Sequence, residues 1–237
     1  MLTRLALRGR GVYKDSHDKG PGGRKNMGDT AKAISDVPVI NKFLGLCRVR
    51  TVPPKTVVIH AGDLPDILYY IVDGSVEVMI EDEDGNEMVL SYLNTGQFFG
   101  EMGLFYEQPP RRAWVRTRTD CELAEMTDPR FRQIANDSPG LLFELATQLA
   151  SRLERTNRKL GDLAFVDVTG RIAPAILDLC NEPDAMTHPE GMQIKVSRQE
   201  LSRLVGCSRE MAGRVLKVLE EQGLLRAKGK TIVVHNV

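Results

Sequence analysis

Residues 98–114, FFGEMGLFYEQPPRRAW, place a carboxylate and two adjacent arginines in an otherwise apolar stretch. Glu101 follows a glycine, and Arg111 and Arg112 follow two prolines. One interpretation is a partly buried ion pair, in which desolvation offsets much of the attraction. The other is a pocket for a small anionic ligand, which a guanidinium binds with charge-assisted hydrogen bonds. The stretch by itself is compatible with both.

Short β-rich runs separated by turn residues surround this stretch. They cover residues 56–60, 68–72, 75–80, 87–93, 113–117 and 121–126. Many short strands at close spacing predict an antiparallel sandwich or roll. A short helix is expected around residues 39–47, and none of the segments between the strands is long enough for a βαβ crossover. The fold class is therefore predicted to be α+β.

A long helix is predicted to follow this β-rich region. Ser138 and Pro139 are a good N-cap and first-turn pair. Apolar residues then recur at alternating steps of four and three, which is the pattern of a two-stranded coiled coil and predicts a homodimer. The positions are Leu142, Ala146, Leu149, Leu153, Thr156, Leu160 and Leu163. The polar Thr156 in this series either sets the register or contacts a ligand beside the helix.

The C-terminal segment has the pattern of a winged helix-turn-helix. After a helix over 169–179 and a loop over 181–191, Ser197 and Glu200 form a capping box that opens a short helix. A Gly-containing turn at 206–208 leads to a second helix that ends near residue 222. The terminal hairpin, LLRAKGKTIVV (224–234), is predicted to form the wing.

The second of these helices has an apolar face and a charged face. Ala212, Val215, Leu216 and Leu219 share one side, and Glu210, Arg214 and Lys217 fall on the other. Glu210 and Arg214 form at least an i,i+4 surface pair. On a helix placed in the major groove, Arg209 and Arg214 would instead donate to guanine edges while Glu210 accepts from cytosine.

Charge and cysteine content narrow the function classes. Lys+Arg and Asp+Glu both total 32, but residues 168–237 carry a net charge of +2 and residues 27–167 a net charge of −7. Nucleic acid is therefore expected at the C-terminal segment rather than over the whole chain. The four cysteines are scattered without a CxxC pair, which argues against a metal site and fits reduced thiols in a cytosol.

Targeting signals are not evident in the sequence. No apolar run approaches the roughly 20 residues that span a bilayer, and the start, MLTRLAL, is too short for a secretory signal. Residues 1–26 are basic and Gly-rich without periodicity, which is typical of disorder. We therefore expect a cytoplasmic protein that does not contact a membrane.

Several long stretches resemble the CRP/FNR family of transcription regulators. They are GSVEV (74–78), EDEDGNEMVLSYLNTGQFFGEMGLF (81–105), LAFVDVTGRIA (163–173), PDAMTHPEGMQIKVSRQE (183–200), VGCSRE (205–210) and GKTIVV (229–234). The resemblance implies a cyclic-nucleotide-binding β-roll, a dimerisation helix and a winged helix-turn-helix. With it, the chain is divided into a disordered basic tail (1–36), the β-roll domain (37–137), the dimerisation helix and hinge (138–166) and the DNA-binding domain (167–237).

The resemblance also implies roles for the residues of the opening stretch. In this family the backbone of Gly100 and the Glu101 carboxylate would take a ribose hydroxyl, Arg111 the cyclic phosphate and Thr156 the purine. The sequence departs from the family pattern at Arg112, where a small residue is usual, and at Asn157, where Ser or Thr is usual. Cyclic AMP is the expected ligand because Glu101, Arg111 and Thr156 keep their types, with cyclic di-GMP as the alternative.

Contacts to DNA and to RNA polymerase are implied in the same way. The base-reading residues are intact, which implies an allosteric activator that binds palindromic TGTGA-type sites. The DNA contacts would be Arg198, Gln199, Ser208, Arg209, Glu210, Arg214 and Lys217. The polymerase contacts would be Thr187, His188 and Gly191 in one loop, Arg48, Arg50 and Arg130 on a basic surface, and the acidic turn 82–87.

Other classes of protein are disfavoured by what the sequence lacks. A redox sensor would need an N-terminal cysteine cluster, and Cys47 is alone there. A haem sensor would need axial ligands, and the four histidines fall mostly in loops or tails. No nucleophile–base pair or metal cluster indicates an enzyme. A DNA-binding protein that needs no ligand stays open, because Arg112 could block the pocket.

Overall fold

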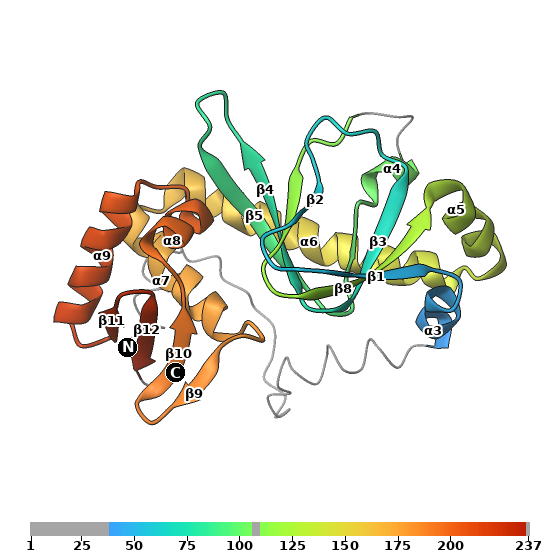
Figure 1. Cartoon of the computed structure of the whole chain (residues 1–237). Coiled ribbons are helices and arrows are strands. Elements are labelled where there is room, and N and C mark those ends of the chain that lie inside the picture. Colours follow the sequence, from blue (N-terminus) through green and yellow to red (C-terminus); the bar gives the residue numbers. More distant parts are fainter. Residues whose placement is uncertain (1–37, 106–109, 236–237) are drawn as a thin grey trace, which may run out of the picture. The chain divides into compact units, whose positions relative to one another are not determined.

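The computed structural model describes residues 38–105 and 110–235, which form two compact units (Figure 1). The first unit extends to Arg155 and the second begins at Thr156. The predicted tail over residues 1–36 lies outside the described residues. In the part of the chain that is described, no helix is both long and apolar enough to span a membrane.

The first unit contains two four-stranded antiparallel sheets. One sheet has the strand order β1-β8-β3-β6 and the other β2-β7-β4-β5. Their strands are β1 (Arg48–Val52), β2 (Val57–Ile59), β3 (Ile67–Asp73), β4 (Ser75–Glu81), β5 (Glu87–Asn94), β6 (Phe98–Phe99), β7 (Trp114–Thr117) and β8 (Cys121–Thr127). Strands that follow one another in sequence often lie in different sheets, so the chain winds back and forth as in a roll.

Two buried clusters hold this unit together. In one, Tyr69 and Phe99 stack in parallel with 4.8 Å between ring centroids, beside Leu93 and Val115. In the other, Phe43 packs edge-on against Phe98 and other rings. Burial of apolar side chains of this size contributes roughly 1.5–3 kcal/mol each. The adjacent residues Phe98 and Phe99 therefore point into different clusters, which fixes the segment that leads to Glu101.

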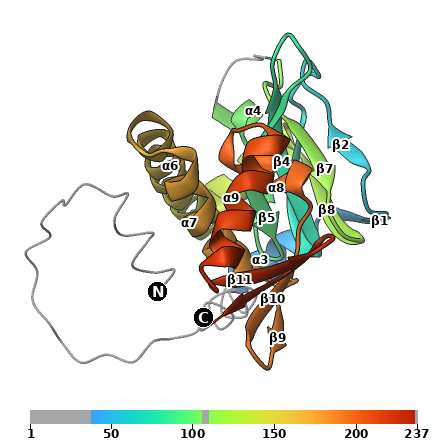
Figure 2. The same cartoon turned by 90° about the vertical axis from the view of Figure 1, so that its left-hand side faces the viewer.

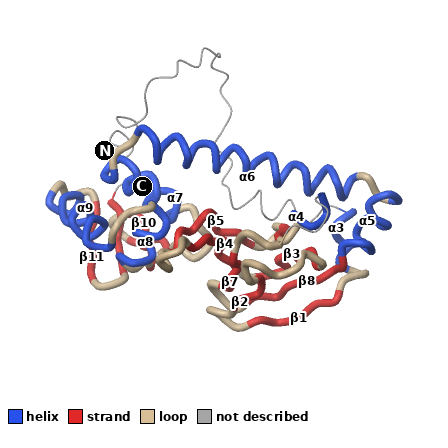
Figure 3. Tube along the Cα trace, turned by 90° about the horizontal axis from the view of Figure 1, so that it is seen from above, coloured by secondary structure: helices blue, strands red, loops and turns tan. Residues whose placement is uncertain are grey.

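Helices cover this roll at its edges. They are α3 (Pro38–Leu44), α4 (Met102–Phe105), α5 (Asp128–Asp137) and the start of α6 (Gly140–Phe165). Leu141 and Leu145 of α6 are fully buried in the cluster around Phe43. Figure 3 shows α6 as one uninterrupted helix.

The second unit packs three helices on a small antiparallel sheet (Figure 2). After the C-terminal part of α6, its elements are α7 (Val168–Cys180), β9 (Met186–His188), β10 (Gly191–Lys195), α8 (Arg198–Val205), α9 (Arg209–Glu221), β11 (Leu225–Lys228) and β12 (Thr231–His235). The sheet order is β11-β12-β10-β9. The hairpin β11–β12 turns at Gly229, where φ is +64° and glycine is favoured. This arrangement is a winged helix-turn-helix.

The structure confirms most of the elements predicted from sequence and corrects several. The six predicted strands are present within two residues of their predicted ends, and the fold class is α+β. The helix predicted over 39–47 ends at Leu44, because Gly45 and Leu46 close its last turn. Residues 186–188 of the predicted loop form strand β9, which pairs with β10. Strands β1, β6 and β10 and helices α4 and α5 were not predicted.

Candidate functional sites

Arg111, near the end of the stretch 98–114, is held by hydrogen bonds from its side chain to backbone carbonyls. Its Nη1 donates to Gly100 O at 2.7 Å, and its Nη2 donates to Ile67 O at 2.8 Å. The backbone of Arg111 also pairs with Asp63 and Gly62, at 2.8 Å each. The side chain of this arginine is half-buried and held in one direction. The structure therefore joins Arg111 to Gly100 although ten residues separate them.

Gly100 must be a glycine for this contact. Its φ is +80°, and a Cβ there would lie 3.0 Å from Arg111 Nη1 and 3.0 Å from Ile67 O. A side chain would displace the guanidinium or strain the backbone. The sharp turn that follows β6 thus brings the guanidinium against the backbone of the residue before Glu101.

Glu101 pairs with an arginine that the sequence did not identify. Its Oε2 lies 3.4 Å from Nη1 of Arg152 on α6, and both side chains are largely buried. Arg152 also donates to Phe98 O. An ion pair between Glu101 and Arg111 was one interpretation of the sequence, and the structure gives Glu101 a different partner. The spacing of Arg152 on α6 carries no signal of this contact.

Burial and the carboxylate act on Arg152 in opposite directions. Desolvation lowers the pKa of its guanidinium, and the charge of Glu101 opposes this effect. Its Nε is buried and has no hydrogen-bond partner among the described residues. The Nε–H of Arg152, beside the Glu101 carboxylate, is therefore available to donate a hydrogen bond to a further acceptor.

The buried carboxyl group of Asp128 interacts electrostatically with Arg111. Desolvation raises the pKa of Asp128, although Arg111 and Arg132 favour its ionised form. Asp128 also limits the space beside α4, because a Cβ on Gly103 would lie 2.6 Å from its Oδ2. The loop around Glu101 is therefore fixed by packing as well as by hydrogen bonds.

The other predicted nucleotide-contacting residues have exposed side chains. Arg112 is exposed and makes no hydrogen bond or ion pair with the described residues. Thr156 and Asn157 are exposed on α6 and belong to the second unit, whereas Gly100, Glu101 and Arg111 belong to the first. The structure thus brings together Gly100, Glu101 and Arg111 of the predicted set.

Helix α6 has a second apolar face that the described residues of the chain leave exposed. Leu142, Leu153 and Leu160 of the predicted seam are 39%, 61% and 65% exposed. Leu141 and Leu145, on the adjacent face about a quarter turn away, are fully buried. An apolar stripe of this kind on a long helix is typical of a helix-packing surface.

The helix-turn-helix begins and turns as the sequence predicted. The hydroxyl of Ser197 accepts from Glu200 N at 3.1 Å, and that of Ser208 accepts from Met211 N at 3.2 Å. Gly206 between the helices has a φ of +70°, in the left-handed region. Each helix therefore starts at a serine cap, and a glycine sets the turn.

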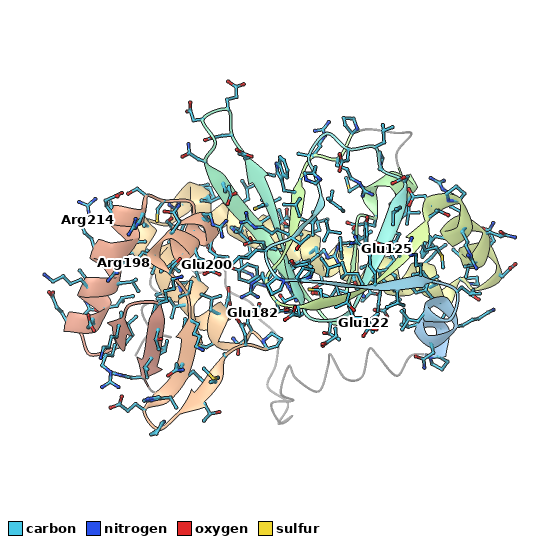
Figure 4. All side chains as sticks on the ribbon, in the orientation of Figure 1. Glu122, Glu125, Glu182, Arg198, Glu200 and Arg214 are labelled. Carbon is cyan, nitrogen blue, oxygen red and sulfur yellow. The ribbon has the colours of Figure 1, made fainter. Side chains whose placement is uncertain are left out.

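The charged face of α9 is exposed and its apolar face is buried, as predicted. Arg209, Glu210, Arg214 and Lys217 are exposed, and Ala212, Val215, Leu216 and Leu219 are buried. Figure 4 labels Arg198 and Arg214, which extend from α8 and α9. Hydrogen bonds from its own backbone N–H and from Ser208, with Arg209 and Arg214 nearby, lower the pKa of Glu210. Glu210 is thus kept as an acceptor beside two donors.

A basic hollow of about 380 Å³ lies between the helix-turn-helix and the wing. It is lined by Ser197, Arg198, Gln199, Arg209, Gly229 and Lys230. Three of these were predicted to contact DNA, and the wing residues Gly229 and Lys230 were not. The only signal for Lys230 in the sequence was its place at the turn of a predicted wing. Positive side chains around a hollow of this size suit a phosphate group.

The residues predicted to contact polymerase belong to three sets, one in the second unit and two, including the largely exposed acidic turn 82–87, in the first. Thr187 and His188 are on β9, and Gly191 starts β10, where it pairs with His188. Arg48 and Arg130 are exposed in the first unit, while Arg50 is ion-paired with Glu125 of β8. Figure 4 labels Glu125 and Glu122, which extend from this strand. The guanidinium of Arg50 is therefore less available to a partner than that of the exposed Arg48.

The four cysteines are free and their environments disfavour reactivity. Burial raises the pKa of Cys47 to about 12 and that of Cys180 to about 11, and it raises those of Cys121 and Cys207 as well. A thiol with a raised pKa is a poor nucleophile and a poor metal ligand. Among the described residues, no group of three or more His, Cys, Asp or Glu side chains could hold a metal ion.

Comparison with known proteins relates both units to one family. Residues 49–138 match the cyclic nucleotide-binding domain, and residues 194–225 match the family described as bacterial regulatory proteins, crp family. The chain is 54% identical over 208 residues to the cAMP-activated global transcriptional regulator Vfr of Pseudomonas aeruginosa, covering 85% of this chain and 97% of Vfr. It is 54% identical over 198 residues to the cAMP-activated regulator CRP of Salmonella typhimurium, covering 84% and 94%.

A solved structure supports the same assignment. The c-di-GMP responsive global regulator CLP of Xanthomonas campestris superposes with a TM-score of 0.80 at 49% identity, covering 84% of this chain and 99% of CLP. All three relatives are regulators and none is an enzyme, in agreement with the prediction from sequence. The chain therefore belongs to the crp family of bacterial regulatory proteins and is a DNA-binding transcriptional regulator.

Proposed function

We propose that this regulator is a homodimer that binds cyclic AMP in its first unit and, when cyclic AMP is bound, palindromic TGTGA-type DNA with its second unit. The geometry of Arg111 against Gly100, beside the buried Glu101, is the observation that carries the nucleotide assignment. Identity of 54% to two cAMP-activated regulators supports cyclic AMP as the ligand.

The cyclic phosphate is assigned to Arg111. Two carbonyl oxygens orient its guanidinium, which leaves its other N–H groups for an anion. An arginine held in place before the ligand arrives loses little side-chain entropy on binding. Charge-assisted hydrogen bonds from such a group are about twice as strong as neutral ones.

The ribose is assigned to Glu101. A carboxylate accepts from a sugar hydroxyl without a change in charge, and the Arg152 guanidinium lies 3.4 Å from this carboxylate at a largely buried site. The purine is assigned to Thr156 and Asn157 of α6. Both side chains are exposed; Thr156 interrupts the apolar seam of that helix, and Asn157 is the next residue.

The dimer is assigned to the exposed seam of α6. The seam runs from Leu142 to Leu163, and a second copy of the helix would cover it as in a coiled coil. A two-fold dimer places two recognition helices about 34 Å apart, in successive major grooves of a palindrome. We accordingly assign residues 37–137 to ligand binding, 138–166 to dimerisation and 167–237 to DNA binding.

The recognition helix is α9. Arg209 and Arg214 would donate to guanine O6 and N7, and Glu210 would accept from cytosine N4. The hollow that contains Arg198, Gln199 and Lys230 would take a backbone phosphate next to the groove. Ser208 and Lys217 lie at the start and middle of the same helix and would add phosphate contacts.

Ligand binding and DNA binding are linked in this proposal. If cyclic AMP favours the arrangement that fits DNA, DNA must tighten cyclic AMP binding by the same factor. The bound dimer would then activate transcription in the cytoplasm through RNA polymerase. The surfaces that we assign to polymerase are the loop with Thr187, His188 and Gly191, the basic residues Arg48, Arg50 and Arg130, and the acidic turn 82–87.

Cyclic di-GMP is the alternative ligand, and two observations favour it. Arg112 adds a second, exposed guanidinium next to Arg111, and CLP, 49% identical, is described as c-di-GMP responsive. A ligand with two phosphates would use both arginines. On the cyclic AMP assignment, Arg112→Ser leaves cyclic AMP affinity within about fivefold, because an exposed ion pair is worth about 1 kcal/mol at most.

Binding to a TGTGA-type duplex tests the proposal. The affinity is measured by fluorescence anisotropy at one fixed salt concentration with no ligand, with cyclic AMP and with cyclic di-GMP, because protein–DNA affinity depends steeply on salt. The proposal expects cyclic AMP to raise the affinity and cyclic di-GMP to leave it unchanged. Tight binding without ligand that cyclic di-GMP releases would assign the site to cyclic di-GMP instead.

A further inference from the structure

The side chain of Gln148 on α6 completes the hydrogen bonding of an edge strand. Strand β6 is the outermost strand of its sheet and pairs with β3. Phe98 N donates to Gln148 Oε1 at 2.9 Å, and Gln148 Nε2 donates to Gly96 O at 3.0 Å. The amide thus stands where the peptide group of a neighbouring strand would stand, at an edge that water otherwise solvates.

The amide of Gln148 is buried with its donors and its acceptor all used. The residue is 7% exposed, and its Nε2 also donates to Glu144 Oε1 at 3.0 Å. Rotation of a buried amide leaves donors and acceptors unpaired, which fixes its orientation. Gln148 therefore ties α6 to the segment 96–98 in a single register.

Arg152 ties the same helix to the other end of the segment. One turn beyond Gln148, it donates to Phe98 O and lies 3.4 Å from Glu101 Oε2. The segment 96–101 is thus held by α6 at both ends. Because Glu101 is the carboxylate assigned to the ribose, a shift of this loop on ligand binding acts on the helix that carries the dimer seam.

We propose that Gln148 is the positioning residue that transmits nucleotide binding from the Glu101 loop to α6. This inference rests on the proposed function. With Gln148 in place, loop and helix move as one body, so a ligand that shifts the loop changes the relative stability of two helix arrangements. Without its hydrogen bonds, the segment 96–101 adjusts locally and the ligand loses its effect on the helix.

The test compares three variants of the full chain with the parent. Gln148→Leu removes all the hydrogen bonds at similar volume, and Gln148→Glu keeps an acceptor for Phe98 N but loses the donor to Gly96 O. Thr147→Ala is the matched control, because Thr147 is exposed and its hydroxyl donates to Phe143 O of the same helix. Calorimetry gives the Kd of cyclic AMP with and without saturating duplex, and the ratio of the two is the coupling factor.

The coupling factor decides the role of Gln148. We expect the parent and Thr147→Ala to share one factor, Gln148→Leu to lower it about fivefold or more, and Gln148→Glu to fall between them. An unchanged factor in Gln148→Leu, whatever its Kd or Tm, would reduce Gln148 to a structural role and overturn the inference. If Gln148→Leu does not fold, the factor of Gln148→Glu decides in the same way. A factor of one in the parent would instead overturn the proposed function itself.

Discussion

Nη1 of Arg152 lies 3.4 Å from Oε2 of Glu101, and the two side chains are only 17% and 12% exposed. The carboxylate assigned to the ribose is therefore held by the helix that carries the dimer seam. Removing one partner of a buried ion pair costs about 3–5 kcal/mol, because the other charge stays buried without compensation. The ion pair thus connects the proposed nucleotide site energetically to α6.

Arg111 is expected to be the residue most sensitive to a conservative exchange in the nucleotide site. Arg111→Lys keeps the charge but loses the two-pronged hold on Gly100 O and Ile67 O, so cyclic AMP affinity should fall about 10- to 100-fold. Calorimetric titration measures the change. The matched control is Arg112→Lys, one residue on, where the side chain is exposed and affinity should stay within about threefold. Equal losses in both variants would contradict the assignment of the phosphate to Arg111.

The seam of α6 predicts a dimer that a single charge disrupts. Leu153 is 61% exposed in the isolated chain and central to the seam, so Leu153→Asp would bury two unpaired carboxylates in the interface. The mass from sedimentation equilibrium should fall from that of a dimer to that of a monomer. Ser151→Asp, on the same helix but outside the seam, should stay dimeric. A dimeric Leu153→Asp would place the interface elsewhere.

The proposed DNA contacts of α9 should separate into two classes. Arg209→Ala should cost about 1–3 kcal/mol on the specific duplex and relax discrimination at one base pair. Lys217→Ala should weaken binding to all sequences alike and lower the salt slope by about one. Anisotropy titrations with single-base variants at several salt concentrations measure both. Uniform weakening by Arg209→Ala would make it a phosphate contact.

Lys159 on α6 predicts a pH dependence of stability in the second unit. Burial lowers the pKa of its ammonium from 10.5 to about 8, although Asp178 of α7 opposes the shift. The folded state therefore loses the Lys159 proton at a lower pH than the unfolded state does. Between about pH 8 and pH 10.5 the unfolded state binds more protons. The free energy of unfolding should therefore rise with pH across this window, by an amount on the order of 1–3 kcal/mol.

The lysine effect is isolated by comparing variants. Lys159→Met should remove the rise, whereas Lys195→Met, at an exposed lysine of β10, should keep it. Urea unfolding between pH 7.5 and pH 10.5 measures the difference from the parent, which removes the contribution of other groups that titrate there. A parent and a Lys159→Met variant with parallel curves would contradict the lowered pKa.

Local signals in the sequence predicted much of this fold. Glycines marked the ends of several strands of the roll. Gly74, for example, has a φ of +96°, which glycine adopts readily and which ends a strand. Serine caps located the starts of both helices of the helix-turn-helix, because a serine hydroxyl accepts a hydrogen bond from an N–H of the first turn. Strand β6 and helix α4 could not be predicted, because elements of two and four residues show no periodicity. Strand β6 is fixed by its pairing with β3, and α4 by its packing against Pro65.

The site itself could be predicted only in part. Glu101 and Arg111 are conspicuous as charges in an apolar stretch, and the family resemblance gave them roles. Arg152 and Gln148 reach the same loop from about 50 residues away, and no local pattern marks them on a helix rich in polar residues. Contacts of this kind depend on how the elements pack, which spacing along one element does not encode.

The linkage between ligand and DNA is the central claim, and one titration addresses it directly. The Kd of cyclic AMP is measured by calorimetry with and without a saturating TGTGA-type duplex, at the same salt concentration. We expect the duplex to tighten cyclic AMP binding by the same factor by which cyclic AMP tightens duplex binding, about 5- to 150-fold. A cyclic AMP affinity that the duplex leaves unchanged would contradict it.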